Sequence, residues 1–173
     1  MAYLINPISP EDREPIMQIL NYYVENTFAA YPEDTLPLEV FDLLFRMTKD
    51  YPTGTIKDQD GNILGFGMFR PHSPIPTFSK TVDASYFIHP DHIGKGLGKQ
   101  LLAYLENKGR DKGVTCILAN ISSLNPKSIA FHKKNGFTEC GCFKNVGKKK
   151  GCVFDTVWMQ KMIIHEKTDF CFT

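Results

Sequence analysis

Apolar and polar positions alternate along this chain with two periods, one typical of helices and one typical of strands. One segment has apolar residues at helical spacing, which would lie on one face of a helix: Ile16, Ile19, Leu20, Tyr23 and Val24. Short runs of branched and aromatic residues between Pro, Gly, Asn and Asp are typical of strands instead. We expect helices at about 10–24, 38–49, 97–112 and 126–135. We expect strands at 3–8, 55–57, 63–69, 81–88, 114–121, 137–144 and 153–162.

Polar turns and a proline-rich segment separate these elements and set the domain organisation. Residues 58–62 form the turn of a hairpin, and the prolines within 71–76 form a stiff connector. The basic run from Lys144 to Lys150 contains the turn of a second hairpin, and we expect it to be a solvated tip. The chain has no internal repeat and no linker. It therefore predicts a single α/β (α+β) domain over 1–173, with a core of about 3–162 and a tail at 163–173.

Composition narrows the class of protein without identifying a reaction. The 20 Lys and Arg residues nearly balance the 19 Asp and Glu residues, so we expect no nucleic-acid partner. No apolar run approaches the roughly 20 residues that span a bilayer, and the N-terminus lacks the pattern of a signal peptide. We therefore expect no membrane partner and a cytoplasmic location. The five cysteines form no CxxC pair and have no histidine at zinc-finger spacing, so we expect free thiols and no metal site.

A glycine-rich segment between a strand and a helix is the strongest chemical signal in the chain. It reads Ile93-Gly94-Lys95-Gly96-Leu97-Gly98-Lys99. Such a turn presents backbone N–H groups at the positive end of a helix dipole, which suits a phosphate. A Walker loop does not fit, because Ile93 stands at its first glycine and Gln100 at its Ser or Thr, and a Rossmann fingerprint does not fit, because Lys99 stands at its third glycine. A flexible turn without a ligand is the remaining alternative.

The order of motifs around this loop resembles a known family. The loop opens a predicted helix, and it is followed by Asn125-Pro126-Lys127-Ser128 and by His132-Lys133-Lys134-Asn135-Gly136-Phe137. In this order the chain is similar to the GCN5-related N-acetyltransferases, and within them to the phosphinothricin acetyltransferase group, over nearly all of residues 3–162. The resemblance implies a mixed, mostly antiparallel central sheet of about seven strands flanked by helices. It also implies acetyl-coenzyme A as cosubstrate and a small-molecule amine as acceptor.

The resemblance assigns the loop to the coenzyme. Residues 93–99 are expected to bind its pyrophosphate through backbone amides, because glycines without Cβ atoms let phosphate oxygens approach. Lys95 or Lys99 could add a point charge. The family usually has Arg or Gln where this chain has Ile93, so one side-chain contact is expected to be absent. Asn125, which is also a natural helix cap, and Ser128 are expected near the pantetheine arm.

Three groups are expected to carry the chemistry. The backbone amide of Phe87 or Ile88 would stabilise the oxyanion that forms when an amine attacks a thioester. Asp83 stands where the phosphinothricin group has a glutamate thought to be the general base, and it would act directly or through water. His132 would protonate the leaving thiolate. Taken alone, Asp83 could also be a solvated or pairing strand residue, and His132 a residue on a helix surface.

The acceptor pocket matches the family least well. Tyr31, Arg70, His72 and Phe78 are expected to line it, although loop residues of these types are often simply exposed. The chain has Ile75 and Phe78 where the family often has an arginine and a tyrosine. A different acceptor from phosphinothricin itself is therefore expected.

Together these features predict an N-acetyltransferase that moves the acetyl group of acetyl-coenzyme A to a small amine, such as an amino acid or an analogue. The segment 28–31 lacks an arginine that could bind a carboxylate. A non-catalytic acyl-coenzyme A sensor or scaffold with the same fold is the alternative.

The family also leads us to expect a homodimer to which the last two strands contribute. The basic run 144–150 could instead contact the 3′-phosphate of the coenzyme.

Overall fold

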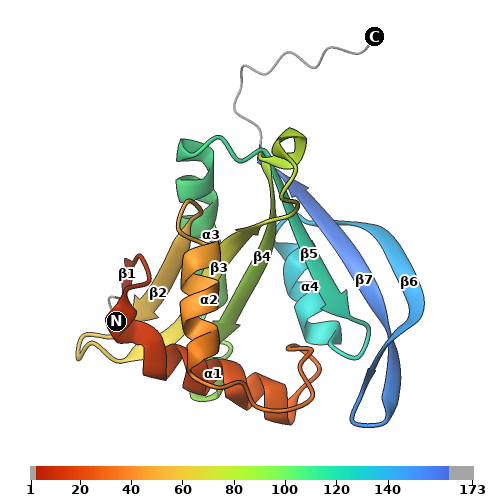
Figure 1. Cartoon of the computed structure of the whole chain (residues 1–173), viewed down its shortest axis with the longest axis horizontal. Coiled ribbons are helices and arrows are strands. Elements are labelled where there is room, and N and C mark those ends of the chain that lie inside the picture. The colour runs from red at the N-terminus through yellow and green to blue at the C-terminus, as the bar shows by residue number, and fades with distance from the viewer. Residues whose placement is uncertain (1–2, 164–173) are drawn as a thin grey trace.

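The computed structural model describes residues 3–163 as one seven-stranded sheet with helices on both faces (Figure 1). The strands are β1 (Leu4–Asn6), β2 (Thr53–Lys57), β3 (Ile63–Pro71), β4 (Thr81–Ile88), β5 (Cys116–Ser122), β6 (Thr138–Lys149) and β7 (Cys152–Met162). Their order across the sheet is β1-β2-β3-β4-β5-β7-β6. Among these described strands β4 and β5 pair in parallel, and every other neighbouring pair is antiparallel. The predicted α/β class and mostly antiparallel sheet are confirmed.

The helices divide between the two faces of the sheet. The α-helices within residues 3–163 are α1 (Arg13–Asn26), α2 (Glu39–Met47), α3 (Leu97–Asp111) and α4 (Pro126–Lys134), with 3-10 helices at Pro10–Asp12, Pro76–Phe78 and Pro90–His92. One buried cluster, which includes Leu101 and Ile117, packs under α3 and α4. Another, which includes Ile16 and Phe66, packs under α1 and α2. Among the described helices, none is long and apolar enough to cross a membrane.

The apolar positions that predicted the first helix are the ones that the fold buries. Ile16 and Val24 have no exposed surface. At the start of the helix, the carboxylate of Asp12 accepts a hydrogen bond from Ser9 N–H (2.9 Å) and pairs with Lys57 Nζ of β2 (2.8 Å). A carboxylate at a helix N-terminus is stabilised by the helix dipole. This contact fixes the helix against the sheet.

Strand boundaries differ from the predicted ones at both ends of the chain. β1 ends at Asn6 because Pro7 has no N–H to donate to the ladder. β6 extends past residue 144 to Lys149, so that the hairpin turn consists of Lys150 and Gly151, both with positive φ. The solvated tip that we expected over 144–150 is therefore wrong for Lys149, whose side chain is buried. The predicted tail, apart from residue 163, lies outside the described residues.

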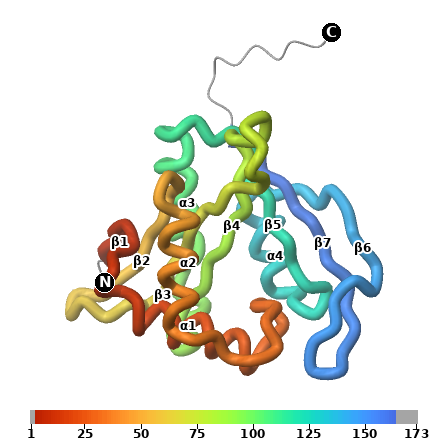
Figure 2. The backbone as a smooth tube through the Cα atoms, viewed as in Figure 1, coloured from red at the N-terminus to blue at the C-terminus, as the bar shows by residue number. Residues whose placement is uncertain are grey.

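The connection between α1 and α2 meets the turn between β6 and β7, far away in the sequence. Figure 2 shows the two segments approaching each other at the lower edge of the molecule. The backbone N–H of Lys150 donates to the carboxylate of Glu33 (2.9 Å). In the same region, the ring of Tyr31 stacks on Phe154 of β7 with centroids 5.7 Å apart. This contact places the α1–α2 connection over the ends of β5 and β7.

Candidate active site

The centre of the sheet opens between β4 and β5. These strands pair only over residues 81–83 and 116–118, although β4 continues to Ile88. In Figure 1 they diverge beyond this point. Within the described sheet, the backbone of β4 from Ala84 onward therefore has no partner strand on its β5 side. Such a gap can receive a ligand that bonds to the free edge of β4.

The register of β3 and β4 decides which amides face this gap. His89 N–H donates to Leu64 O (2.7 Å), directly across the β3–β4 ladder. Because hydrogen-bonded positions alternate along an antiparallel pair, the amide of Phe87 also points toward β3 and that of Ile88 points into the gap. Of the two amides expected to stabilise the oxyanion, Ile88 has the suitable direction. Its carbonyl accepts a hydrogen bond from the Tyr23 hydroxyl of α1 (2.6 Å), which holds the end of the strand in place.

The glycine loop leads into α3 at the wide end of the gap. Gly94 and Gly96 have φ of 83° and 78°, in the left-handed region that glycine adopts at least cost. Gln100 N–H donates to Gly96 O (3.3 Å), and the amides of residues 97–99, which lie between these two, have no acceptor within the helix. A Cβ atom on either positive-φ glycine would meet no atom within 4 Å. The loop thus combines free amides, the positive end of a helix dipole and open space, a combination that fits a pyrophosphate.

The side chains of the loop comprise one anchor and several exposed groups. Leu97 is fully buried against side chains of β2 and β3. Ile93, in contrast, is 58% exposed and offers no charge. Lys99 is exposed, and Lys95 Nζ lies 3.4 Å from His92 Nδ1. A phosphate at this loop would therefore be bound mainly by backbone amides, with lysines nearby.

Asn125 caps α4 as the sequence predicted. Its Oδ1 accepts a hydrogen bond from Ser128 N–H (3.2 Å), and Pro126 occupies the first helical position. Both Asn125 and Ser128 are half-buried at the start of the helix. Their contact with a pantetheine arm stays a prediction.

His132 lies in the core between α4 and β4. It is 4% exposed, and its Nδ1 is 2.7 Å from the carbonyl oxygen of Ser128, which can only accept, so Nδ1 carries the proton. Its Nε2 then accepts a hydrogen bond from the Tyr86 hydroxyl (2.5 Å). Burial lowers the pKa of His132, which favours this neutral form. With both nitrogens engaged, His132 has no N–H left for a leaving thiolate, and it does not lie on the helix surface either.

Asp83 and His72 form a pair on the α1–α2 face of the sheet. The carboxylate Oδ1 of Asp83 lies 3.0 Å from His72 Nδ1, and both side chains are about one-third exposed. The His72 ring is 6.3 Å from the Trp158 ring and 6.4 Å from the Phe78 ring, edge to face in both cases. The structure thus brings together three of the residues that the sequence placed in the site, and the carboxylate already has a hydrogen-bond partner.

Tyr31 lies farther along the same face. Its hydroxyl donates to Asn120 Oδ1 (2.8 Å). Burial raises the pKa of Tyr31 to about 12, so the hydroxyl keeps its proton at neutral pH. Asn120 of β5 stands opposite Trp158 of β7, which in turn contacts His72. A line of contacts therefore joins the two ends of the expected acceptor pocket.

Arg70 is next to Asp83 on this face. The two residues are directly opposite each other in the β3–β4 register, so their side chains lie on the same side of the sheet. The Nε of Arg70 is buried and has no hydrogen-bond partner among the described residues. The buried Nε is closed to a ligand, but Arg70 as a whole is partly exposed, and the terminal nitrogens of a guanidinium group can bind an anionic group such as a carboxylate.

Sequence reasoning missed Tyr86, Asn120 and Trp158. Trp158 is the only tryptophan of the chain, and in the predicted strand it has the parity opposite to that of the apolar Val157 and Met159. That parity was the available signal. Tyr86 gave none, because its hydrogen bond to His132 depends on how α4 packs against β4.

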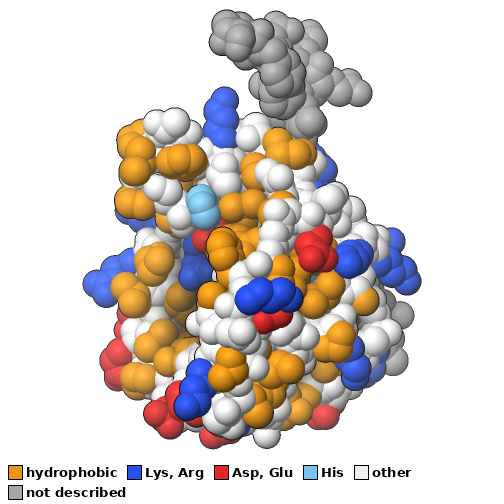
Figure 3. All heavy atoms as spheres, turned by 90° about the vertical axis from the view of Figure 1, so that its right-hand side faces the viewer, with side chains coloured by type: hydrophobic (Ala, Val, Ile, Leu, Met, Phe, Trp, Pro, Cys, Tyr) orange, Lys and Arg blue, Asp and Glu red, His pale blue; other side chains and the backbone are white. Residues whose placement is uncertain are grey.

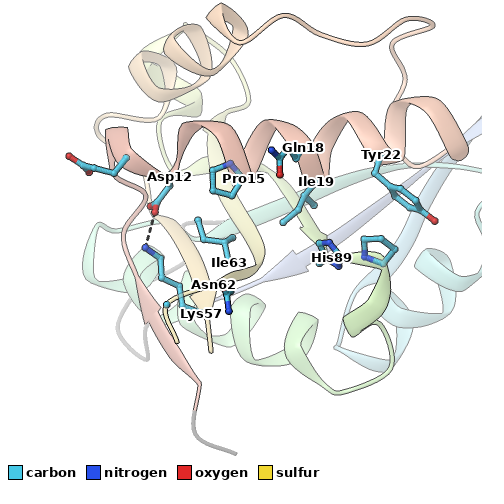
Figure 4. Close-up of a pocket in the computed structure, with 12 residues that line it drawn as sticks. Asp12, Pro15, Gln18, Ile19, Tyr22, Lys57, Asn62, Ile63 and His89 are labelled. Carbon is cyan, nitrogen blue, oxygen red and sulfur yellow. Dashed lines mark hydrogen bonds and ion pairs between the residues drawn. The ribbon is translucent and has the colours of Figure 1, made fainter. Parts of the chain in front are cut away.

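A separate surface cavity of about 630 Å³ lies between α1 and the turn that joins β2 to β3 (Figure 4). It contains the ion pair of Asp12 and Lys57, with Tyr22 and His89 on its far side. None of the residues that we expected in the catalytic, coenzyme or acceptor sites lines it. The candidate active site is therefore the β4–β5 gap and not this cavity.

Comparisons with known proteins agree with this geometry. The model of the Acetyltransferase (GNAT) family matches residues 16–137. The L-methionine sulfoximine/L-methionine sulfone acetyltransferase of Pseudomonas aeruginosa is 33% identical over 162 residues, which cover 92% of this chain and 94% of that protein. The L-amino acid N-acyltransferase MnaT of Escherichia coli is 32% identical over 160 residues, 91% of this chain and 92% of that protein.

A solved structure shows the same fold. The structure of yncA, an acetyltransferase from Salmonella typhimurium with its cofactor acetyl-CoA, has a TM-score of 0.88 and 29% sequence identity. It covers 99% of this chain and 100% of that chain. The family model spans the glycine loop, the gap and the Asp83–His72 pair. With a family match over most of its length, this chain belongs to the GNAT acetyltransferase family.

Proposed function

We propose that this enzyme transfers the acetyl group of acetyl-coenzyme A to the α-amine of a small amino acid or amino acid analogue. As a member of the family, it is an acetyl-coenzyme A-dependent N-acetyltransferase. The observation that carries the choice of acceptor is Arg70, whose partly exposed side chain stands opposite Asp83 on the acceptor face, with its Nε unpaired among the described residues. A carboxylate and an amine on one small molecule would meet these two groups side by side.

Arg70 supports an acceptor with a carboxylate. A guanidinium group binds a carboxylate with two parallel hydrogen bonds, which fixes orientation as well as charge. The relatives act, by name, on methionine sulfoximine, methionine sulfone and L-amino acids. Phe78 and Trp158 would contact the side chain of such an acceptor, since both rings stand near His72. Tyr31 would bound the pocket at its other end.

Acetyl-coenzyme A supplies the acetyl group as a thioester. Residues 93–99 would hold its pyrophosphate, and Asn125 with Ser128 would line the path of its pantetheine arm. The amide of Ile88 would stabilise negative charge on the thioester oxygen, because it points into the gap. These roles agree with the free amides at the start of α3 and with the divergence of β4 from β5.

Asp83 would take the proton that the acceptor's ammonium group must lose before attack. A base needs to be within about 3 Å of that proton, or to act through one water molecule. The hydrogen bond from His72 fixes the carboxylate, and the partial exposure of both leaves room for such a water. His132 would not donate to the thiolate directly. It would position Tyr86, the residue two before Ile88 on β4.

Thiol release from acetyl-coenzyme A tests the proposal. L-methionine sulfone, L-methionine sulfoximine and phosphinothricin are offered beside the amine that lacks the carboxylate of methionine sulfone. We expect turnover on at least one amino acid and little on the decarboxylated amine, and R70Q should reduce this preference about tenfold or more. A preference unchanged in R70Q would contradict the role of Arg70. Tight binding of acetyl-coenzyme A without turnover on any amine would instead support the alternative function, a non-catalytic acyl-coenzyme A sensor.

We also propose that the protein forms a homodimer through β6. This edge strand is exposed along most of its length, and Phe143 and Val146 on it are each 59% exposed, with Val153 of β7 52% exposed. Figure 3, viewed from the side of these strands, shows hydrophobic side chains among the charged ones. An edge strand presents unpaired N–H and C=O groups that can pair with a strand of another chain, and exposed apolar side chains beside them favour such pairing. Sedimentation should show a dimer that the double variant F143D/V146D converts to a monomer; a wild-type monomer at all concentrations would contradict it.

A cytoplasmic location is part of this proposal. The four described cysteines, at 116, 140, 142 and 152, are free thiols. Free thiols are typical of a reducing compartment. Cell fractionation against marker enzymes of each compartment tests this assignment.

A further inference from the structure

Lys149, the last residue of β6, has a buried ammonium group with a full set of acceptors. Its side chain is 1% exposed. Its Nζ lies 2.6 Å from the carbonyl oxygen of Val24, 2.8 Å from that of Thr27 and 2.7 Å from that of Ala30. An ammonium group has three N–H donors, and these carbonyls use all of them.

The three carbonyls belong to the end of α1 and to the segment that follows it. The helix ends at Asn26, so Val24 O is among the last carbonyls of the helix, which have no partner within it. The negative end of the helix dipole favours a cation at this position. Thr27 and Ala30 lie in the connection to α2, which has no regular secondary structure between residues 27 and 38. One side chain from a distant hairpin thus supplies the hydrogen bonds that this connection cannot make with itself.

Further contacts join the β6–β7 hairpin to the end of α1 and to the α1–α2 connection. The backbone N–H of Lys150 donates to Glu33, and the Lys150 ammonium contacts Glu25 O. Phe154 of β7 contacts the rings of both Phe28 and Tyr31. The hairpin therefore fixes the connection on both sides of Tyr31.

Tyr31 connects this junction to the acceptor face. Its hydroxyl donates to Asn120 Oδ1, and Asn120 stands opposite Trp158 in the sheet. We propose that Lys149 is a positioning residue for the acceptor pocket, because its ammonium group sets the conformation of residues 27–31 and thereby the place of Tyr31. This positioning role rests on the proposed acceptor site. The hydrogen bonds by which Lys149 fixes the connection do not depend on that site.

A purely stabilising role does not require a charge at this position. A buried charge is costly to remove from water, and apolar replacements of similar size are often as stable. What the ammonium group supplies, and an apolar side chain cannot, is a fixed geometry among three carbonyls. The consequence to test is therefore the conformation of the connection and the binding of the acceptor.

The test compares K149M and K149R with K148M. Met is unbranched and nearly as long as Lys but has no donors. Arg keeps the charge, with a flat geometry that does not match three converging carbonyls. Lys148 is exposed on the same strand and is the matched control. Hydrogen exchange of residues 27–33, the Kd of acetyl-coenzyme A and the KM and kcat for L-methionine sulfone, or for the best acceptor among the amino acids offered above, are measured for each folded variant.

We expect both Lys149 variants to exchange at least tenfold faster in 27–33 and to raise the acceptor KM about fivefold or more, with the Kd of acetyl-coenzyme A within twofold of wild type. K148M should match wild type in the exchange of 27–33 and in the acceptor KM. Faster exchange with an unchanged acceptor KM would overturn the positioning role, and unchanged exchange would overturn the whole inference. If K149M does not fold, the exchange rates and acceptor KM of K149R decide whether Lys149 is a positioning residue. If wild type acetylates none of these acceptors, the proposed function fails, while the exchange data still decide whether Lys149 holds the connection.

Discussion

Gly94 and Gly96 show how single residues prepare the coenzyme loop. Their positive φ lets the chain turn into α3 with its first amides unobstructed, and the space beside their α-carbons is open. A Cβ at either position would not clash with the protein, so packing alone does not explain why both are glycine. The left-handed backbone explains part of it, and a ligand that approaches the backbone would explain the rest.

Replacing Gly96 with Ala should weaken coenzyme binding more than it destabilises the fold. A non-glycine residue in the left-handed region costs about 1–2 kcal/mol, and the new methyl group would lie where phosphate oxygens approach. Gly61 is a matched control, because it also has positive φ and a methyl group added there would meet no atom within 4 Å. We expect a similar loss of unfolding free energy in G96A and G61A, and a Kd for acetyl-coenzyme A about tenfold higher only in G96A. Calorimetry measures the Kd and urea unfolding measures the free energy of unfolding. If G96A and G61A bind acetyl-coenzyme A equally well, the loop is not part of the coenzyme site.

Asp83 is the residue on which turnover should depend most. Loss of a general base typically costs about 10²–10⁴ in rate, so D83N should lower kcat by at least 10² without changing the Kd of acetyl-coenzyme A. H72Q, which keeps a polar group but no imidazole, should lower kcat less if His72 only fixes the carboxylate. D60N, in the exposed β2–β3 turn, is the control. Steady-state kinetics decide the order, and a larger loss in H72Q than in D83N would make His72 the base.

Residues near each other in sequence were predictable, and contacts between distant strands were not. The loop at 93–99 and the Asn125 cap depend on local spacing, and both take the expected conformation. The Asp83–His72 pair depends on the β3–β4 register, which no local pattern fixes. Lys149 misled us because a run of lysines beside a turn is usually solvated, whereas a longer β6 directs this one inward onto α1.

At the scale of elements, α4 and β4 are joined by a polar contact inside an apolar layer. The Tyr86 hydroxyl and His132 satisfy each other there, and Ser128 O takes the remaining proton of the imidazole. A buried polar pair of this kind is stable only while both partners are present and neutral. We therefore expect the packing of α4 against β4 to depend on pH.

Stability should fall as the pH drops from 7.5 to 5.5, and H132L should lessen the fall. Burial lowers the pKa of His132 in the folded state, so below its ordinary pKa the unfolded chain binds a proton that the folded one does not. H132L should also lose about 1–3 kcal/mol at pH 7.5, because it leaves the Tyr86 hydroxyl buried without a partner. Urea unfolding at both pH values measures this, with H92N as the control at a partly exposed histidine. An identical pH dependence in wild type and H132L would assign the effect to other groups.

At the scale of the whole molecule, the sheet is continuous on both sides of a central opening. β1 to β4 form one half and β5 to β7 the other, and the two halves meet in a short parallel pairing at one end of the strands. α1 packs on β3, and the connection that follows it contacts β5 and the β6–β7 hairpin, so the two halves are joined a second time. A ligand bound along the gap would contact β4 and α3 on one side and α4 on the other. Coenzyme binding should thus stabilise both halves together.

Acetyl-coenzyme A should raise the melting temperature, and the shift should grow with the logarithm of its concentration above Kd. A ligand that binds only the folded state adds about 2.7 kcal/mol at 100 times its Kd. For a chain of this size, about 1 kcal/mol corresponds to roughly 2–4 °C, so we expect a shift of about 5–11 °C. Hydrogen exchange should slow at residues 84, 86 and 88, whose amides face the gap, and in the loop at 94–99. At the same coenzyme concentration the melting temperature of G96A should rise less than that of wild type, and that of G61A should rise as much. Exchange that slows instead around the cavity between α1 and the β2–β3 turn would place the coenzyme outside the gap.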